Sequence, residues 1–384
     1  MSYELSGEAK MTLDLARKFA KNDIEPIAEE IDVKGEFPRD LYRKMGELGL
    51  LGMRFPVEYG GSAEGGSDLI LGAMCNEELA KASAGFVLSA GASTFLFGNN
   101  VLELGTDDQK KKYLPRIASG EAIGCWGLTE PDAGSDALGI KTRATQDGDF
   151  WIINGRKTFI TNAPIADYFI VIARTSGVPG EITGGTSFIL ERGMEGLETG
   201  KPFEKMGMRC SPTGEIFLDN VRVHKSNMLG AEGMGFLGMM KSLDIERAVA
   251  GAINIGIAQA CLDICLKYIT ERKQFGRPLA KFQLIQGKVA RIYRDIELSR
   301  VYLRHVLTMI NEGRRVTAEA GVAKWFATEM GTNAALEAIQ ILGGYGYCRE
   351  YKVERYMRDA KLLEIGAGTT EINKLLIAKM IIGK

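Results

Sequence analysis

The hydrophobic pattern of the chain centres on a run without Asp, Glu, Lys or Arg at residues 248–262. Through and beside this run, apolar residues recur at every third or fourth position, at Ile245, Val249, Ile253, Ile257, Cys261 and Ile264. This spacing predicts a helix, and the near absence of a polar face predicts that the helix is buried on all sides. Because a bilayer crossing needs about 20 apolar residues, the run is too short to span a membrane. We therefore expect the central helix of a large bundle.

Helix patterns also fill the N-terminal third of the chain. Residues 15–32 and 37–53 are amphipathic, and an apolar helix is expected at 69–82 after a glycine-rich loop at 55–68. Thr106 precedes a further helical run and is predicted to be its N-cap, because its hydroxyl can accept a hydrogen bond from a free backbone N–H.

Short apolar or alternating runs replace the helix pattern from Ala122 onward, and turn residues separate them. Such runs are typical of β-strands. The predicted strands lie within 122–130, 149–162, 167–174, 186–192 and 214–223. We expect a mostly antiparallel β domain, either a barrel or a sandwich.

Long helices return after Leu229. They are predicted at 235–272, 279–312, 317–342 and 370–381. The chain is therefore expected to have an α+β fold. Its predicted domains are an N-terminal helical domain (1–121), a middle β domain (122–231) and a C-terminal helical bundle (232–384).

Composition excludes several classes of function. The 384 residues carry 48 Lys and Arg against 49 Asp and Glu, so neither nucleic acid nor an anionic membrane is expected as the main partner. The first residues lack the apolar core of a signal peptide, which favours a cytoplasmic location. The six cysteines are scattered and the only histidines are His224 and His305, so neither a metal site nor a Ser-His-Asp triad is expected.

One dinucleotide-binding pattern is misleading here. Gly233, Gly235 and Gly238 match G-x-G-x-x-G, but that motif has meaning only between a strand and a helix of a parallel βαβ unit. The residues that follow are helical in pattern and contain no partner strand. We interpret the motif as the entry into the central helix.

Charged residues stand at the N-terminal end of the uncharged run, in the sequence LDIER with Asp244, Glu246 and Arg247. A carboxylate partly inside a dry bundle has its charged form disfavoured, which tunes a general base towards neutral pH. The alternative is that Glu246 complements the helix dipole or pairs with an arginine. These residues alone favour the alternative.

Glycine-rich turns and one aromatic strand are further candidate sites. The segment PDAGSD (131–136) can offer backbone N–H groups to an anion or a polar ring edge. Phe159 and Thr161 are expected on one side of a strand, although an aromatic residue in a strand is more often part of the core. The turns at 340–347 and 365–371 are ambiguous when each is taken singly.

Taken together and in order, eight segments resemble the acyl-CoA dehydrogenase family over essentially the full length of the chain. They are YGG (59–61), QKKKYLPRIASGE (109–121), LTEPDAGSD (128–136), NGRKTFITN (154–162), KMGMRCSPTGEIFLDNVRV (205–223), RKQFGRPLAKFQ (272–283), QILGGYGY (340–347) and MRDAKLLEIGAGTTEI (357–372). The resemblance implies an N-terminal helical domain, a middle β domain and a C-terminal four-helix bundle, in agreement with the pattern above.

The resemblance also implies FAD held between the β domain and the bundle. The residues expected to line the flavin and the thioester are Trp126, Leu128, Thr129, Gly134 and Ser135, with Phe159 and Thr161 against the isoalloxazine. The contacts expected from a neighbouring subunit to the FAD diphosphate and adenosine come from Arg272, Phe275, Gln283, Gln340, Gly343 and Gly344. Contacts from the last loop are expected from Thr369 and Glu371. Such contacts imply a homo-oligomer, at least a dimer and, by the habit of the family, a tetramer.

The last loop departs from the main pattern of the family. Most members carry the catalytic base there in Y-E-G-T, whereas this chain has Ala367 at the Glu position, and a methyl group cannot accept a proton. A subset best represented by isovaleryl-CoA dehydrogenases also has I-G-A-G-T in the loop and places the base in L-D-x-E-R on the bundle helix. This chain shows both features, so the resemblance implies that Glu246 is the base.

In this family the base removes the α-proton of an acyl-CoA while the β-hydride passes to N5 of FAD, giving a 2,3-enoyl-CoA and sending electrons to an electron-transfer flavoprotein. The thioester oxygen is polarised by a ribityl hydroxyl and by the backbone N–H at the position of Ala367. The expected substrate contacts are Ser135, Leu237, Asp244, Arg247 and Gly368.

The sequence does not distinguish between branched, compact and ring-bearing acyl groups in the substrate. An acyl-CoA oxidase and an enoyl-CoA reductase working on the same site are alternatives. A flavin-bearing relative that binds DNA is disfavoured, because it would need a basic extra domain.

Overall fold

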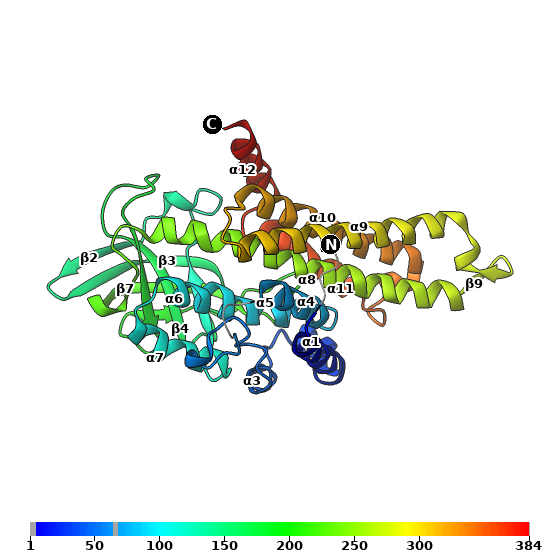
Figure 1. The fold of residues 1–384 in the computed structure, drawn as a ribbon, viewed down its shortest axis with the longest axis horizontal. Coiled ribbons are helices and arrows are strands. Elements are labelled where there is room, and N and C mark those ends of the chain that lie inside the picture. The colour runs from blue at the N-terminus through cyan, green and yellow to red at the C-terminus, as the bar shows by residue number, and fades with distance from the viewer. Residues whose placement is uncertain (1–4, 64–67, 384) are drawn as a thin grey trace.

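Helices come first in the part of the chain that the computed structural model describes, residues 5–63 and 68–383 (Figure 1). They are α1 (Gly7–Phe19), α2 (Ala28–Lys34), α3 (Arg39–Glu47), α4 (Leu69–Ala80), α5 (Ala84–Gly91), α6 (Asn99–Leu104) and α7 (Asp107–Ala118). The predicted N-cap of α7 is confirmed: the Thr106 hydroxyl accepts from the Gln109 N–H at 3.3 Å, and the Gln109 side chain accepts from the Thr106 N–H at 3.0 Å. Of the predicted loop at 55–68, residues 64–67 lie outside the described residues.

A β-sheet follows, and its hydrogen bonds join eight strands in the order β6-β7-β3-β2-β4-β5-β8, with β1 paired to β4. The strands are β1 (Gly124–Gly127), β2 (Arg143–Asp147), β3 (Phe150–Thr161), β4 (Tyr168–Arg174), β5 (Gly185–Glu191), β6 (Leu197–Thr199), β7 (Thr213–His224) and β8 (Met228–Leu229). Most pairs are antiparallel, while β1 and β2 each meet β4 in parallel. All five predicted strands are present. The pattern missed β2, β6 and β8, which are short and mostly polar or only two residues long.

The C-terminal half is helical again. Its helices are α8 (Gly235–Glu271), α9 (Gln283–Asn311), α10 (Thr317–Leu342), α11 (Val353–Ile365) and α12 (Thr370–Ile382), and a small hairpin of β9 (Lys273–Gln274) and β10 (Arg277–Pro278) connects α8 to α9. The predicted start of α9 at 279 is wrong, because Leu279–Lys281 form a separate 3-10 turn after Pro278. Helix α11 was not predicted. The domain bounds at 121/122 and 231/232 stay a prediction.

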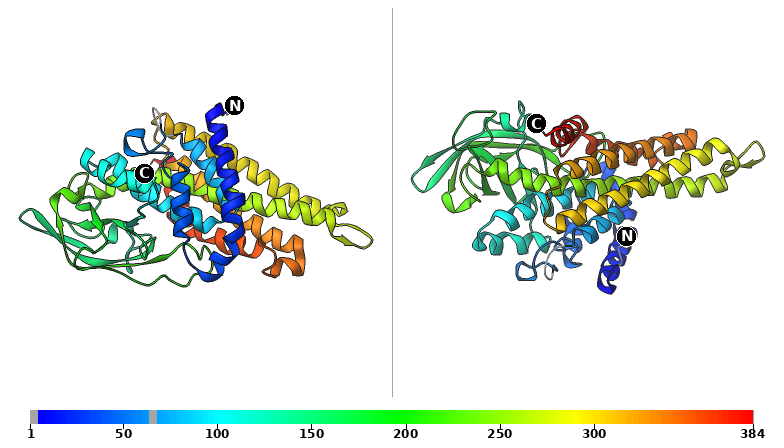
Figure 2. Two further views of the ribbon diagram at one scale, coloured as in Figure 1. Left: turned by 90° about the horizontal axis from the view of Figure 1, so that it is seen from below. Right: turned by 45° about the horizontal axis from the view of Figure 1, so that its top comes forward.

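Helix α8 runs through the middle of the molecule and packs against α10, α9, α4 and α11 (Figures 1 and 2). The predicted burial is confirmed for residues 248–262, of which only Ala250 and Gln259 are partly exposed. With 37 residues, α8 is long and apolar enough by length and composition to cross a membrane, yet 72% of its most apolar 18-residue window is buried inside the protein. Such burial is expected of a core helix.

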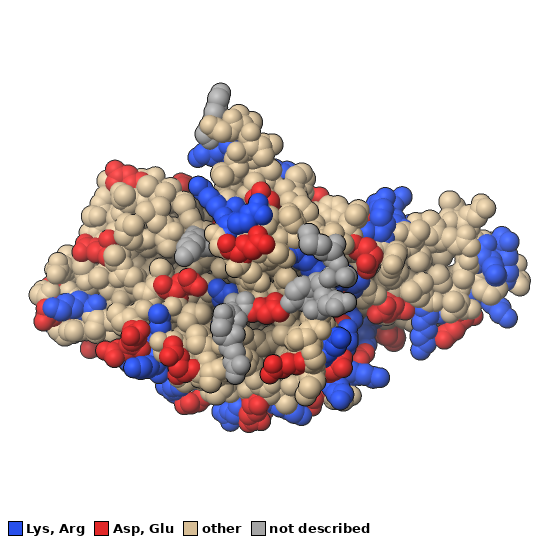
Figure 3. Space-filling model, viewed as in Figure 1, with Lys and Arg blue, Asp and Glu red and all other residues tan. Residues whose placement is uncertain are grey.

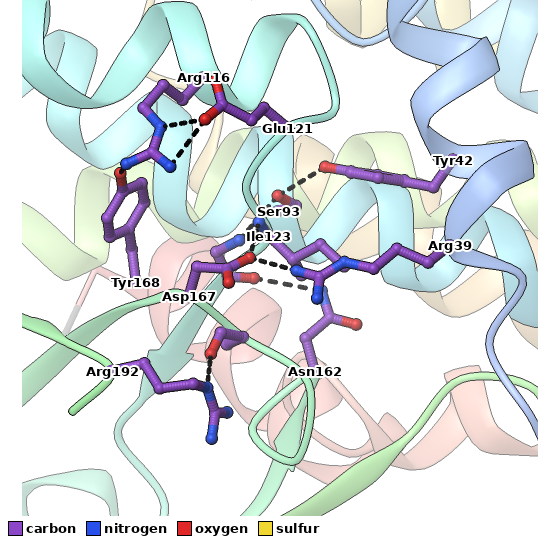
Figure 4. A network of polar contacts seen from close by, with 12 residues as sticks. Arg39, Tyr42, Ser93, Arg116, Glu121, Ile123, Asn162, Asp167, Tyr168 and Arg192 are labelled. Atoms are coloured by element: carbon purple, nitrogen blue, oxygen red, sulfur yellow. Dashed lines mark hydrogen bonds and ion pairs between the residues drawn. The ribbon is translucent and has the colours of Figure 1, made fainter.

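A polar network ties the first strand of the sheet to the N-terminal helices (Figure 4). The Ser93 hydroxyl accepts hydrogen bonds from the Tyr42 hydroxyl at 2.8 Å and from the Gly124 N–H at 2.9 Å. Asp167 accepts from the Ile123 N–H at 2.8 Å and pairs with Arg39. These contacts fix β1, and therefore the loop that follows it, against the helices. At the surface, acidic and basic side chains are interspersed across the face in Figure 3.

Candidate active site

Glu246 lies three turns into α8, just before the uncharged run. The residue is half-buried, and its Oε2 is shielded from solvent with no hydrogen-bond partner among the described residues. Burial raises the pKa of Glu246 to about 7, although the nearby cations of Arg247 and Lys324 act in the opposite direction. A carboxylate with this pKa is a competent proton acceptor near neutral pH.

The two charged neighbours of Glu246 on α8 are engaged with each other. Arg247 Nη1 donates to Asp244 Oδ1 at 3.1 Å, and the Thr317 hydroxyl donates to Asp244 Oδ2 at 2.7 Å. Asp244 therefore ties α8 to the start of α10. The Arg247 Nε is buried and has no partner among the described residues, so it is a donor available to a ligand. Arginine is well suited to bind a polar ligand group.

The turn between α11 and α12 holds two consecutive residues in the left-handed region, Ala367 at φ 55° and Gly368 at φ 85°. Its carbonyl at Gly368 accepts hydrogen bonds from Lys324 Nζ at 2.6 Å and from Asn373 Nδ2 at 2.9 Å. No described residue accepts a hydrogen bond from the Ala367 N–H, which is free to donate elsewhere. Thr369 caps α12 through its hydroxyl, which accepts from the Ile372 N–H at 3.3 Å.

Lys324 was missed by the sequence analysis. It lies on α10 with 0% exposure, and burial lowers its pKa to about 8. The signal was present as a single lysine inside the apolar run AGVAKWFA, where a cation needs a specific partner.

A second buried lysine braces the loop after β1. Lys157 on β3 has 0% exposure; its Nζ donates to the Leu128 carbonyl at 3.1 Å and pairs with Glu130 at 2.8 Å. The Thr158 N–H donates to the Thr129 carbonyl at 2.9 Å. The predicted flavin-lining residues Leu128 and Thr129 are thus held rigidly at the edge of the sheet.

Phe159 is 69% exposed and has φ 56°, so the interpretation of it as a core residue is wrong. A register shift between Lys157 and Ile160 interrupts the pairing of β3 with β7 and turns the ring outward. An exposed aromatic beside Thr161 fits a flat ring that packs on it. At Gly134, an added Cβ would meet nothing within 4 Å, which leaves room for a ligand. This part of the site therefore fits a flavin, together with half-buried Trp126 and exposed Ser135.

The residues predicted to reach a neighbour's FAD lie at the other end of α8, near the β9–β10 hairpin and opposite the sheet (Figure 1). Three of them, Arg272, Gly343 and Gly344, line a cavity of about 450 Å³ together with Tyr345. Phe275 is 91% exposed on the hairpin. Gln283 opens α9, and Gln340 is exposed near the end of α10.

One chain does not bring the two sets of predicted cofactor residues together. Glu246 lies on α8 and Arg272 directly follows the last residue of this helix, 26 residues later, which at a rise of about 1.5 Å per residue separates them by about 39 Å. If both sets bind one FAD, a second copy must supply the far set.

Two of the predicted site residues have surroundings in the structure that do not define their role. Leu237 is substantially exposed on the first turn of α8, and Glu371 is exposed on the first turn of α12. Among the described residues, no group of three or more His, Cys, Asp or Glu side chains could hold a metal ion.

Comparison with known proteins identifies three consecutive domains. Residues 6–121 match the acyl-CoA dehydrogenase N-terminal domain, residues 125–221 the middle domain and residues 233–382 the C-terminal domain. Three similar curated proteins are a probable acyl-CoA dehydrogenase YngJ of Bacillus subtilis (45% identical, covering 100% of both chains), a 3-(aryl)acrylate reductase of Clostridium sporogenes (44%, covering 96% of this chain and 97% of the relative) and a mitochondrial isovaleryl-CoA dehydrogenase of Solanum tuberosum (42%, covering 94% and 87%).

Solved structures agree with the fold. Butyryl-CoA dehydrogenase from Megasphaera elsdenii is 39% identical and superposes over 100% of both chains with a TM-score of 0.96. A chain from a structure described as the electron transferring flavoprotein of Acidaminococcus fermentans matches with the same identity, coverage and TM-score.

Proposed function

This chain belongs to the acyl-CoA dehydrogenase family, and from that premise we propose that it removes the α-proton of a branched, compact or ring-bearing acyl-CoA with Glu246 as the base. Members of the family are FAD-dependent flavoproteins, and the chain is an oxidoreductase that acts on CH–CH groups. The product is the 2,3-enoyl-CoA.

The observation that carries the proposal is the unpartnered Oε2 of Glu246 at the edge of a dry helix. When the α C–H bond breaks, this oxygen takes the proton, and the electron pair left on the α-carbon forms the new double bond. A pKa near 7 lets the carboxylate be substantially deprotonated at neutral pH while remaining basic enough to accept the proton.

The Ala367 N–H is proposed to donate to the thioester oxygen. Because this N–H has no acceptor among the described residues, it can stabilise the negative charge that grows on that oxygen as the proton leaves. The buried Nε of Arg247 is proposed to orient the acyl-CoA. Gly368, Asp244, Ser135 and Leu237 stay proposed substrate contacts.

FAD, when bound, supplies the acceptor for the hydride from the β-carbon. Phe159, Thr161 and the braced loop from Leu128 to Ser135 would hold its ring, with Thr369 and Glu371 nearby. The residues at the far end of α8 would hold the FAD of a second copy of the chain. We therefore propose a homo-oligomer, a dimer at least and a tetramer by analogy with the family.

An electron-transfer flavoprotein is the proposed electron acceptor, supported by the match to a chain in a structure of that system. A cytoplasmic location stays a prediction; all six cysteines are free, which suits a reducing compartment.

Reduction of an enoyl group is a second candidate function. It is favoured by the 44% identity to a 3-(aryl)acrylate reductase. In that direction Glu246 would deliver its proton to the α-carbon, so the same geometry serves both reactions. An oxidase that uses oxygen as acceptor is a third outcome of the assay below.

The test is a panel of straight, branched and aryl acyl-CoA substrates with an electron-transfer flavoprotein or a dye as acceptor. Glu246→Gln keeps the shape of the side chain and should lower substrate-dependent flavin bleaching at least ~100-fold without loss of FAD. Glu271→Gln at the exposed end of the same helix is the matched control and should behave like the parent. Bleaching of the Glu246→Gln variant at the parent rate would show that the base lies elsewhere.

A further inference from the structure

Lys324 is a buried cation that lacks an ion-pair partner among the described residues. Its Nζ contacts a backbone carbonyl, that of Gly368, at 2.6 Å. Lys157, which also has 0% exposure, has a carboxylate at 2.8 Å. Burial without a close counter-ion is costly for a charge, so the position of Lys324 calls for a reason beyond packing.

The carbonyl that Lys324 holds belongs to the turn that presents the Ala367 N–H. Both Ala367 and Gly368 are in the left-handed region, which is unfavourable for alanine because its Cβ approaches the carbonyl oxygen. Such a conformation persists only where surrounding contacts impose it. Here the contacts are the two donors to the Gly368 carbonyl, Lys324 from α10 and Asn373 from α12.

The same ammonium group also acts on Glu246. Lys324 and Arg247 are the cations that oppose the burial-driven rise of the pKa of Glu246, and Glu246 is in turn the leading charge that favours protonated Lys324. Because Arg247 already donates to Asp244, Lys324 is, of the two described cations that act on Glu246, the one that is not paired with a carboxylate.

The other charged groups around this pair come from three elements. Asp244 and Arg247 lie on α8, Glu364 lies on α11 and Glu371 lies on α12; Glu364 and Glu371 also favour protonated Lys324. Glu364 is paired with Lys361 at 2.8 Å.

We propose that Lys324 is a positioning residue of this active site: through the Gly368 carbonyl it holds the Ala367 N–H in place, and through its charge it keeps Glu246 available as a base. The proposal rests on the proposed role of Glu246. In this proposal one side chain, which contacts neither the α-carbon nor the thioester oxygen, supports both parts of the reaction. These parts are proton removal from the α-carbon and charge stabilisation at the thioester oxygen.

Two variants separate the hydrogen bond from the charge. Lys324→Met removes both while keeping an apolar stem of similar length. Lys324→Gln removes the charge and keeps an N–H donor. Lys205→Met is the matched control, since Lys205 is a partly buried lysine that donates to the Ser211 carbonyl at 2.8 Å and has Asp359 and Arg209 among its charged neighbours.

The first readout is the pH dependence of kcat/KM. The base works when deprotonated, so the rate falls as pH falls through its pKa. Loss of a nearby cation raises the pKa of a carboxylate, so both Lys324 variants should move the acid limb to higher pH. We expect a shift of roughly one unit, which is about a tenfold loss of kcat/KM on that limb. The Lys205→Met variant should keep the parent limb.

The second readout is the infrared stretch of a ¹³C-labelled thioester carbonyl in an acyl-CoA analogue bound to the oxidised holoenzyme. A displaced Ala367 N–H polarises this carbonyl less, so its frequency should move towards the value in free solution in Lys324→Met and less so in Lys324→Gln. FAD content and melting temperature are measured on each variant. If Lys324→Met does not fold, Lys324→Gln alone still tests the effect of charge.

The proposal is overturned if Lys324 variants that fold keep both the parent acid limb and the parent carbonyl frequency. A separate result tests the assignment of Glu246 as the base: if the Glu246→Gln variant still shows flavin bleaching, that assignment is wrong. If Glu246→Gln abolishes bleaching while the Lys324 variants match the parent in both readouts, only the role of Lys324 is wrong.

Discussion

Replacing Glu246 by Gln should make the protein more stable at high pH while it removes activity. The folded protein holds a proton at Glu246 up to a pKa of about 7, against 4.5 for an ordinary glutamate. Between these values the folded state binds more protons than the unfolded state, so the stability of the parent falls as pH rises. Glutamine does not ionise, and the variant is free of this loss.

The magnitude follows from the shift. A difference of about 2.5 units at about 1.4 kcal/mol per unit sets an upper limit of about 3.5 kcal/mol. Glu246 is only half-buried as a residue, and solvent screening reduces the effect of partly exposed charges. We expect on the order of 1–2 kcal/mol at pH 8 and little at pH 4.5, seen as a rise of a few degrees in the melting temperature.

The assay is thermal unfolding of parent and variant holoenzymes between pH 4.5 and 8.5 with the same excess of FAD. Glu195→Gln is the control, because this carboxylate is exposed in the folded protein. The quantity to follow is the variant-minus-parent difference at each pH, since a new buried amide also changes stability by a constant amount. A difference that stays the same from pH 5 to pH 8 would refute the assignment of a raised pKa to Glu246.

Three further substitutions test the framework of the protein and its assembly. Gly124→Ala should destabilise by ~1–3 kcal/mol in thermal unfolding, because an added Cβ would lie 2.4 Å from the Phe97 ring, whereas Gly134→Ala has open space around it and should be tolerated. Phe275→Ala should leave the fold intact, because the ring is exposed, but should lower FAD content and shift sedimentation towards smaller species; a variant with parental assembly and FAD would contradict the cross-subunit role.

The local features of this protein could be predicted from the sequence. The bounds of α10 coincide with the predicted 317–342, and all five predicted strands are present. These predictions succeed because the periodicity of a helix or strand depends on residues that are close together in the sequence. The joint occurrence of Ala367 in the last loop and Glu246 on the bundle helix could also be recognised from the sequence, through the resemblance to the family. Helix α11 was overlooked, although Val353, Tyr356, Ala360 and Leu363 recur at helical spacing on its buried face.

Only the tertiary structure decided how distant residues meet. The register shift that exposes Phe159 depends on the partner strand β7, which no pattern within β3 reveals. The contact of Lys324 with the Gly368 carbonyl joins residues 44 positions apart, one on α10 and the other in the turn between α11 and α12. The length of α8 keeps the two sets of predicted cofactor residues at opposite ends of one chain. Periodicity predicts which face of an element is buried, but the packing of the whole chain determines which residues contact that face. In this protein the packing leaves Oε2 of Glu246 without a hydrogen-bond partner among the described residues, next to the uncharged part of α8.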